Sequence, residues 1–215
     1  MHYLSNLFDA LDFGSIQDMV LRLASVLLCL TIHEMCHGLA AFALGDPTAK
    51  SQHRLSLNPL RHIDWFGLAM LAVAGFGWAK PVQVNPNYFK KPKMGMAITA
   101  LAGPLSNMVL ALVLLFATKI LLNGGVQTYW LLMFLLNTAM LSIGLGIFNL
   151  IPIPPLDGSK VLFAVLPDRQ YNLLMQYERY GMILLLALVM MGAGGHFLSQ
   201  ANRAVFDLFW RVVGL

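Results

Sequence analysis

The composition of this 215-residue chain is that of a membrane protein. Hydrophobic residues make up 58% of the sequence, charged residues only 11%, and the formal net charge is +4. A soluble domain carries roughly 25% charged residues, so these values exclude a soluble enzyme, a disordered protein, a coiled coil and a nucleic-acid-binding domain. We therefore expect the lipid bilayer to surround most of the chain and no nucleic acid to be a partner.

The first predicted membrane helix covers residues 23–45, in which Glu34 is the only charged residue. A helix of this length rises about 35 Å and can cross a hydrocarbon core of about 30 Å. Residues 1–14 lack a basic stretch and a small-residue cleavage motif. We therefore expect no cleaved signal peptide.

Two basic loops flank a short apolar segment in the next part of the chain. Residues 45–63 and 80–93 are polar and basic, whereas residues 65–79 are apolar but short for a membrane span. This length favours a re-entrant segment. Residues 81–86 alternate in polarity between two prolines, which predicts a short β-like edge strand.

Three more membrane-associated helices are predicted towards the C-terminus. Residues 94–156 contain Lys119 as their only charge, and the polar turn 123–128 divides them into two spans. The second span then meets three prolines, which cannot continue an ordinary helix. The uncharged residues 180–202 predict a further span.

The end of the chain, residues 199–215, predicts an interfacial amphipathic helix. Its apolar face is expected to consist of Val205, Leu208, Phe209, Val212 and Val213. The whole chain is then a single membrane-embedded domain over residues 1–215, with a core at 15–198 and this tail outside it. The predicted fold class is an all-α polytopic membrane protein with about four transmembrane helices, a re-entrant segment with the strand region, and the C-terminal amphipathic helix.

The distribution of lysine and arginine predicts the orientation. Cytosolic loops are enriched in these residues, which assigns loops 45–63 and 80–93 to the cytosol if residues 65–79 do not cross the bilayer. The uncharged loop 123–128 then lies outside, as does the N-terminus.

A zinc-binding sequence, His33-Glu34-Met35-Cys36-His37, lies within the first predicted span. Histidines four residues apart share one helix face, so both imidazoles can reach one Zn²⁺. Glu34 then flanks the metal and can take a proton from its bound water. Ionisable side chains at membrane depth are costly, which favours a functional site over a buried polar cluster that packs helices.

A catalytic zinc site needs a third protein ligand. Asp157 is the best candidate because it follows the proline-broken end of a span, where irregular backbone can line a water-filled cavity. The residues alone support a helix N-cap role for Asp157 equally well. Glu178, the only other glutamate, and Cys36, which shares the face of His33 and His37, are weaker alternatives.

Several sequence blocks together resemble the site-2 protease family of intramembrane zinc metalloproteases. They follow one another from residue 33 to about residue 162: HExxH at 33–37, Leu57-Asn58-Pro59-Leu60 with His62-Ile63-Asp64, Gly77-Trp78-Ala79-Lys80-Pro81-Val82, Ala102-Gly103-Pro104-Leu105-Ser106-Asn107, and NxxPxPPLDG at 149–158. Within this family, the chain most closely resembles the compact members without PDZ or CBS modules.

The resemblance implies an enzyme that binds one Zn²⁺ per chain and hydrolyses peptide bonds within or near transmembrane segments of membrane-protein substrates. It implies that His33, His37 and Asp157 bind the zinc, that Glu34 is the general base, and that Asn149 steadies the oxyanion. It also implies a multi-pass location in the cell membrane, with the active site within the bilayer towards the cytosolic side.

Val82, Val84 and Asn85 are the substrate-binding residues that the resemblance implies. The segment from Pro81 to Pro86 resembles the family's strand region, which pairs with an unwound substrate by strand addition. A plain connecting loop is an equally good interpretation of this segment.

The sequence departs from the family pattern in the first basic loop, where His53 stands in place of a usual glycine and Trp65 in place of a usual proline. These departures affect the loop and not the metal motifs. We expect His53 and His62 to be exposed loop histidines, with an auxiliary ligand role as the alternative.

Rival functions are weaker. A membrane zinc or other metal transporter also carries histidine and glutamate on membrane helices, but its motif has proline within it and an acidic residue after the second histidine. This chain has Met35, Cys36 and Gly38 at those places. A membrane-anchored zincin would need Glu178 as a ligand, and the complete metal set disfavours a catalytically silent interaction protein.

Overall fold

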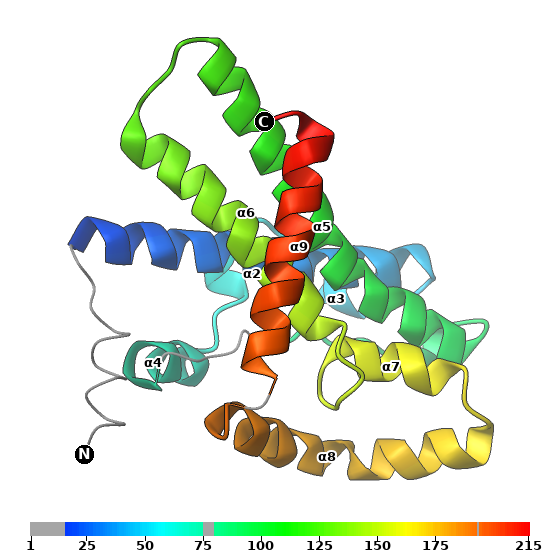
Figure 1. Ribbon diagram of the computed structural model, residues 1–215. Helices are drawn as coiled ribbons and strands as arrows, with labels where there is room; N and C mark the ends of the chain where they lie inside the picture. Colours follow the sequence, from blue (N-terminus) through cyan, green and yellow to red (C-terminus); the bar gives the residue numbers. More distant parts are fainter. Residues whose placement is uncertain (1–15, 75–79, 193) are drawn as a thin grey trace.

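The computed structural model describes residues 16–74, 80–192 and 194–215, which form a helical protein (Figure 1). Within them, three helices are long and apolar enough to cross a membrane: α2 (Ile16–Ala43), α5 (Pro92–Asn123) and α6 (Tyr129–Asn149). A fourth candidate is the bent pair formed by the end of α8 (Asp168–Met190) and by α9 (Gly195–Val213), which meet at 87°. The prediction of a mostly helical, multi-pass membrane protein is confirmed.

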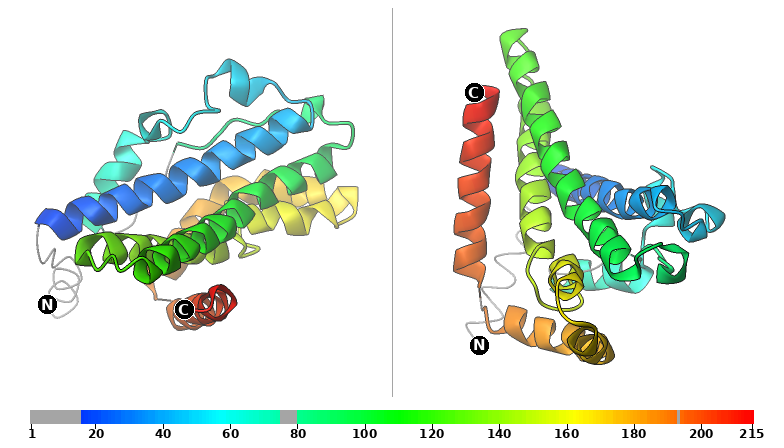
Figure 2. Two further views of the ribbon diagram at one scale, coloured as in Figure 1. Left: turned by 90° about the horizontal axis from the view of Figure 1, so that it is seen from above. Right: turned by 90° about the vertical axis from the view of Figure 1, so that its right-hand side faces the viewer.

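The core lies between α5 and α6, which run in opposite directions and are packed side by side (Figures 1 and 2). Small residues allow this close approach, as is usual where membrane helices pack. Ala111 of α5 and Ala139 of α6 are fully buried. At Gly146 of α6 a Cβ would lie 2.7 Å from the Cε of Met108 on α5.

Helix α2 crosses this pair and contacts both of its members. The hydroxyl groups of Ser25 and Thr138 lie 2.7 Å apart and hydrogen-bond α2 to α6. A polar pair of this kind holds two helices together where lipid offers no competing partner. His33 and His37 lie further along the same helix, where α2 meets α5.

The two basic loops lie between α2 and α5 in the chain. They contain α3 (Thr48–Ser51), 3₁₀-helix η1 (Pro59–Arg61) and 3₁₀-helix η2 (Pro86–Tyr88), and α4 (Trp65–Ala74) lies between the two loops. The N–H of Lys80 donates to the carbonyl of His62 over 2.9 Å, so the chain returns after α4 to the place from which it left. Residues 75–79 of the predicted re-entrant segment, and the predicted outer N-terminus, lie outside the described residues.

The predicted β-like strand at residues 81–86 is not present, since these described residues form no strand. Backbone N–H groups of this segment donate to side-chain carboxylates rather than to a neighbouring strand. The N–H of Val82 donates to Glu34, and that of Asn85 donates to Asp46. The two prolines have no N–H to donate. The segment is therefore an irregular stretch of chain tied to α2 and to its end.

The span predicted at residues 180–202 is not one straight helix, because it is part of the bent pair formed by α8 and α9. Helix α8 begins earlier and ends at Met190, and Gly192 and Gly194 follow with φ angles of 68° and 79°. Such positive φ angles suit glycine and do not continue a helix. The segment is apolar, as expected, but these glycines end the helix within it.

The C-terminal helix is present as α9, and it packs along α5 and α6 (Figure 2). Its packed face consists of Val205, Phe206, Phe209, Trp210 and Val213. Leu208 and Val212, which were expected on that face, are exposed. The apolar surface of the two spans therefore selects a face rotated from the predicted one.

Asp46 generates a prediction about stability. This fully buried carboxylate accepts hydrogen bonds from the N–H and hydroxyl of Thr48 and, over 2.7 Å, from the N–H of Asn85. Asp46→Ala leaves those donors without an acceptor, which we expect to lower the free energy of unfolding by about 2 kcal/mol and the midpoint of thermal unfolding by about 4–8 °C. Tryptophan fluorescence of the purified protein in detergent measures this midpoint. The midpoint of Asp46→Asn, which keeps one acceptor oxygen, should lie between those of the unchanged protein and Asp46→Ala. An unchanged midpoint in Asp46→Ala would contradict a stabilising role of the Asp46 carboxylate.

Candidate active site

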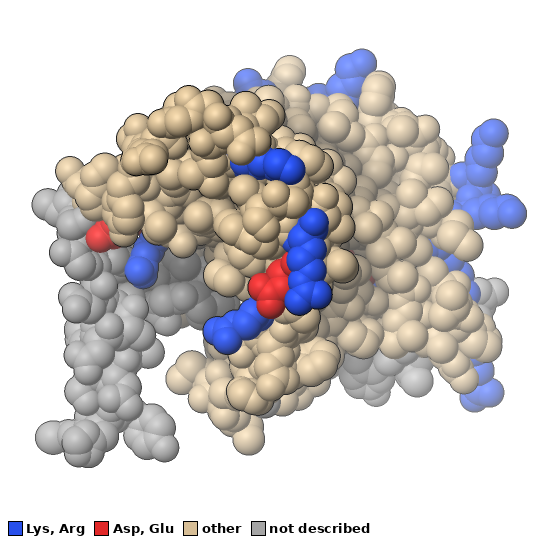
Figure 3. Space-filling view, turned by 45° about the horizontal axis from the view of Figure 1, so that its top comes forward, with Lys and Arg blue, Asp and Glu red and all other residues tan. Residues whose placement is uncertain are grey.

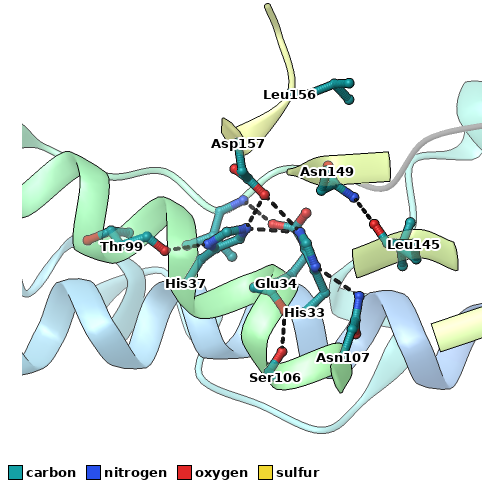
Figure 4. Close-up of polar contacts among 12 residues, drawn as sticks. His33, Glu34, His37, Thr99, Ser106, Asn107, Leu145, Asn149, Leu156 and Asp157 are labelled. Atoms are coloured by element: carbon teal, nitrogen blue, oxygen red, sulfur yellow. Dashed lines mark hydrogen bonds and ion pairs between the residues drawn. The ribbon is translucent and has the colours of Figure 1, made fainter. Parts of the chain in front are cut away.

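Two histidines of α2, His33 and His37, lie next to one another with their rings in contact (Figure 4). They are one helical turn apart, and their Nε2 atoms are separated by 3.0 Å. Both are buried, with 4% of His33 and 8% of His37 exposed. Two imidazoles so close, with their Nε2 atoms pointing at the same place, can share one cation.

Asp157 reaches the histidines from the opposite side. Helix α6 ends at Asn149, the proline-rich turn reverses the chain, and α7 (Asp157–Ala164) begins with this aspartate. Its Oδ2 lies 3.1 Å from the Nε2 of His33 and 3.1 Å from that of His37. Leu156 occupies the N-cap position of α7, so the alternative that Asp157 caps this helix is wrong.

Gly158, the residue after Asp157, allows α7 to begin close to the end of α6. A Cβ at Gly158 would lie 2.1 Å from the carbonyl oxygen of Leu150. Any side chain there would push the start of α7 away from the end of α6. The Asp-Gly pair of the sequence motif thus combines a carboxylate with the one residue that lets it approach α2.

The three ligand atoms fit a zinc ion. All lie within 4.8 Å of one another, and their separations of 3.0–3.1 Å are close to the edge of about 3.3 Å expected for a tetrahedron around Zn²⁺. A histidine that binds zinc through Nε2 needs an acceptor for its Nδ1 proton. For His37 this acceptor is the carbonyl of Thr99, 2.7 Å away.

His33 has a matching acceptor in Asn107. The side-chain amide of this fully buried residue lies 3.1 Å from the Nδ1 of His33, with the nitrogen drawn towards the ring and the Oδ1 without a hydrogen-bond partner. The nitrogen and oxygen of an amide are assigned from their partners. Exchanging them gives the orphaned Oδ1 a donor and gives His33 the acceptor that zinc binding requires.

Space for the imidazoles comes from Gly103 of α5. A Cβ at this glycine would lie 2.5 Å from the Nε2 of His37 and 2.7 Å from the Cε1 of His33. Contacts this short do not occur between real atoms, so no other residue fits here without moving the rings. Helix α5 therefore supplies the floor of the site.

Glu34 and Asn149 lie beside the three ligands (Figure 4). The Oε2 of Glu34 accepts a hydrogen bond of 2.9 Å from the N–H of Val82. The side-chain amide of Asn149 donates to the carbonyl of Leu145, one turn back on its own helix, over 2.9 Å. Each side chain is held by a bond that a small rotation would release.

Two cavities meet at the site. One, of about 490 Å³, is lined by the three ligands, Glu34, Asn149 and the segment 81–84. The other, of about 290 Å³, shares His33, Glu34 and Asn149 but continues between apolar residues of α2, α6 and α8. The site is thus open to a polar space on one side and to an apolar space on the other.

The implied substrate-binding residues lie at the first cavity only in part. Val82 and Val84 line it, whereas Asn85 lies further along, bonded to Asp46. Cys36 does not join the group of ligand atoms, and Glu178 falls among the residues whose side chains are not described.

Of the loop histidines, His53 is exposed as expected. His62 is not, since only 2% of it is exposed and its Nε2 lies 2.8 Å from the carbonyl of Ser56. The expectation of an exposed His62 is therefore wrong, because this side chain folds back into its own loop.

Thr99, Gly103 and Asn107 were not assigned roles from the sequence. Two of them belong to the Ala-Gly-Pro-Leu-Ser-Asn block, whose presence was a signal that α5 contributes to the site. The sequence of this block does not indicate which face of α5 contacts the histidines. Thr99 contributes only a backbone carbonyl, which leaves no mark on the residue type.

Comparison with known proteins agrees with this site. Residues 118–192 match peptidase family M50. Several relatives carry the name "Putative zinc metalloprotease". Among them, YwhC of Bacillus subtilis is 37% identical over 194 residues, 86% of this chain and 89% of that protein. Rip2 of Mycolicibacterium smegmatis is 29% identical over 201 residues, 89% of this chain and 72% of that protein.

A shorter match is found with the zinc metalloprotease RasP of Oceanobacillus iheyensis, which is 68% identical over 31 residues, 14% of this chain and 7% of that protein. No solved structure matches the chain. The match to YwhC extends over most of both proteins, and the family match covers the region from the end of α5 to the break after α8. The chain therefore belongs to peptidase family M50, the site-2 protease family of intramembrane zinc metalloproteases.

Proposed function

We propose that this chain hydrolyses peptide bonds within or near transmembrane segments of membrane proteins, with His33, His37 and Asp157 as the ligands of one Zn²⁺. The observation that carries the assignment is the convergence of three ligand atoms from α2 and α7 within 4.8 Å, beside the carboxylate of Glu34. A transporter needs no such neighbouring base, and neither the family nor its relatives support one. The whole chain, residues 1–215, acts as one membrane-embedded domain.

Glu34 is the general base in this proposal. A zinc ion held by His33, His37 and Asp157 would lower the pKa of a bound water and polarise the carbonyl that is attacked. The carboxylate of Glu34 would accept the proton of the attacking water and return it to the leaving amine. For this the carboxylate exchanges its hydrogen bond with the N–H of Val82 for one with the water.

Asn149 supports the negative charge that develops on the carbonyl oxygen. Its amide lines the polar cavity next to the ligands and is held by a single bond to the carbonyl of Leu145. Rotation about its side chain frees the N–H to donate to the oxyanion. The lost bond costs little, because that carbonyl already takes part in the helix.

The substrate pairs with the segment that contains Val82, Val84 and Asn85. This segment lines the polar cavity, and within the described residues the N–H groups of Gln83 and Val84 have no hydrogen-bond acceptor. An unwound peptide can supply one by strand addition. Unwinding is required because the carbonyls of a helix are already hydrogen-bonded.

The two cavities suit the two reactants. The apolar cavity between α2, α6 and α8 receives the hydrophobic substrate from the bilayer, and the polar cavity admits water. Residues 81–84 of the second basic loop line the polar cavity, and the lysine and arginine residues of the two loops favour a position of the site towards the cytosolic side, with residues 65–79 as a re-entrant segment between the loops.

The base is tested by Glu34→Gln. We expect cleavage of a tagged single-span substrate in vesicles to fall by a factor of about 10²–10⁴, because proton transfer is lost while the shape is kept. Gel electrophoresis follows the product, and mass spectrometry of the metal shows that zinc stays bound. Glu178→Gln changes the only other glutamate and should cleave normally. Undiminished cleavage by Glu34→Gln removes this role.

The third ligand is tested by zinc content. Purified protein should hold one zinc per chain, Asp157→Ala should lose it, and Glu178→Ala should keep it, because three protein ligands are needed to hold a catalytic zinc. Elemental analysis after dialysis against a weak chelator measures the ratio. If the two variants exchange these results, Glu178 and not Asp157 is the ligand.

The floor of the site is tested by Gly103→Ala. The added methyl group must displace the imidazoles, and a shift of about 1 Å costs about 10²-fold in cleavage rate. Gly195→Ala is the control, because a Cβ there meets nothing within 4 Å. Thermal unfolding of both variants separates a displaced site from a damaged fold. Normal cleavage by Gly103→Ala would show that α5 does not position the histidines.

A further inference from the structure

The polar cavity at the site contains one cationic side chain that has no role in the steps described above. Lys160 of α7 lines this cavity together with the three proposed ligands, Glu34 and Asn149. Among the described residues that line it, Lys160 is the only lysine or arginine. It lies three positions after Asp157, and residues at this spacing are neighbours on the surface of a helix. Helix α7 therefore presents a carboxylate and an ammonium group to the same cavity.

The surroundings of Lys160 differ from those of the other lysines. Figure 3 shows basic side chains that extend outward from a mostly uncharged surface. The lysines of the two basic loops that are exposed are Lys50, Lys80, Lys90 and Lys91. Lys93 and Lys119 are half-buried, as is Lys160. However, the first two donate hydrogen bonds to backbone carbonyl groups, those of Leu166 and Val213.

The ammonium group of Lys160 has no partner in the described part of the chain. It forms no ion pair with Asp157, whose carboxylate instead lies 3.1 Å from the Nε2 atoms of both histidines. Among the described residues it also has no hydrogen bond like those of Lys93 and Lys119. A charged group that is partly removed from water without a partner raises the free energy of the protein. An anion that enters the cavity removes this cost.

The charges around the cavity favour an anionic group beside Lys160. The carboxylates of Glu34 and Asp157 are the other charged side chains among the described residues that line it. Histidines that bind a metal are neutral. With Zn²⁺ bound, the two positive charges of the ion offset the two carboxylates, and the charge of Lys160 remains unbalanced. A negatively charged group of the substrate is then attracted, whereas a positively charged one is repelled.

We propose that Lys160 determines substrate specificity by binding the carboxylate of an aspartate or glutamate side chain of the substrate near the cleaved bond. This role of Lys160 rests on the proposed protease function, in which the substrate pairs with the segment that contains Val82 and Val84. Both of these residues line the same cavity as Lys160. The ammonium group donates charge-assisted hydrogen bonds to the carboxylate of the substrate.

The spacing along α7 limits where the acidic residue of the substrate lies. The attacked carbonyl is next to the ligand Asp157, and the Cβ atoms of helical residues three positions apart are about 5–6 Å from each other. An extended peptide advances about 3.3 Å per residue, so the acidic side chain belongs to a residue within about three positions of the cleaved bond.

A lipid phosphate is the other source of an anion. Lipid phosphates lie at the bilayer surface, where exposed lysines such as Lys90 can meet them. Lys160 instead is half-buried and lines the cavity that holds Glu34 and Asn149. Its position therefore favours a carboxylate of the substrate.

Paired substrates test the proposal. Aspartate, asparagine or lysine is placed at successive positions along the transmembrane segment of a tagged substrate in neutral-lipid vesicles, and mass spectrometry of the products identifies the cleaved bond. Near that bond, the unchanged protein should cleave an aspartate substrate with a kcat/KM about tenfold above that of its asparagine counterpart. Lys160→Met should bring this ratio to about one, and Lys160→Glu should favour lysine at the same position.

Lys90→Met is the matched control. It removes the same charge from an exposed lysine that does not line the cavity, so it should keep the ratio of the unchanged protein. Because the result is a ratio between two substrates, a variant that only damages the fold lowers both rates together and leaves the ratio as it was.

Binding separates the role of Lys160 from the protease function. The same substrates, with a photo-crosslinking group beside the altered position, are titrated against the Glu34→Gln protein. Half-maximal crosslinking should need about tenfold less of the aspartate substrate than of the asparagine substrate, and adding Lys160→Met should remove this difference. If no protein cleaves any substrate, the protease function fails, and the crosslinking still decides whether Lys160 binds the carboxylate.

Three results would overturn the proposal. The first is that no position of the substrate shows a preference for aspartate in either measurement. The second is that Lys160→Met keeps the preference of the unchanged protein. The third is that Lys160→Met alters only the response to phosphatidylglycerol added to the vesicles, which would identify a lipid phosphate as the partner of Lys160.

Discussion

The structure depends on keeping three ionisable side chains together at membrane depth. An imidazole or carboxylate is tolerated there only when other groups satisfy it. The histidines of α2 are satisfied on one side by each other and by Asp157, and on the other by Thr99 and Asn107 of α5. The fold can be understood as the arrangement of α2, α5 and α7 that makes these contacts possible.

This constraint explains features that look unrelated in the chain. Gly103 and Gly158 lie far apart in sequence, yet each removes a side chain where two elements must touch around the site. The proline-rich turn after α6 redirects the backbone so that a carboxylate enters from the side opposite to α2. Carboxylates outside the cluster, on Glu34 and Asp46, tie down the irregular segment that borders the polar cavity.

Most of the architecture follows from the sequence, because apolar runs, glycines and prolines mark where spans begin and end. His33 and His37 could be anticipated from the HExxH spacing, whereas the residues alone left Asp157 open between metal ligand and helix cap, and the family resemblance pointed to the ligand role. The local sequence pattern gave wrong predictions where contacts with residues distant in sequence determine the conformation. The segment 81–86 alternates like a strand, but the acceptors of its N–H groups are side chains from α2 and its end. The face of α9 that is buried depends on the shape of α5 and α6, and periodicity alone does not reveal it. His62 was expected to be exposed because it lies in a basic loop, and only the folded loop shows that it turns inward.

The distance along the chain between the parts of the site has a consequence for biosynthesis. His33 and Asp157 are separated by 124 positions in sequence, and the glycine and asparagine of α5 that complete the surroundings of the histidines lie between them. A ribosome delivers the helix with HExxH to the membrane long before α7 has been made. During that interval the unfinished chain contains the proposed base and the two histidines but lacks the carboxylate of Asp157. With His33, His37 and Asp157 as the proposed zinc ligands, the site can be completed only after most of the polypeptide has been inserted into the bilayer.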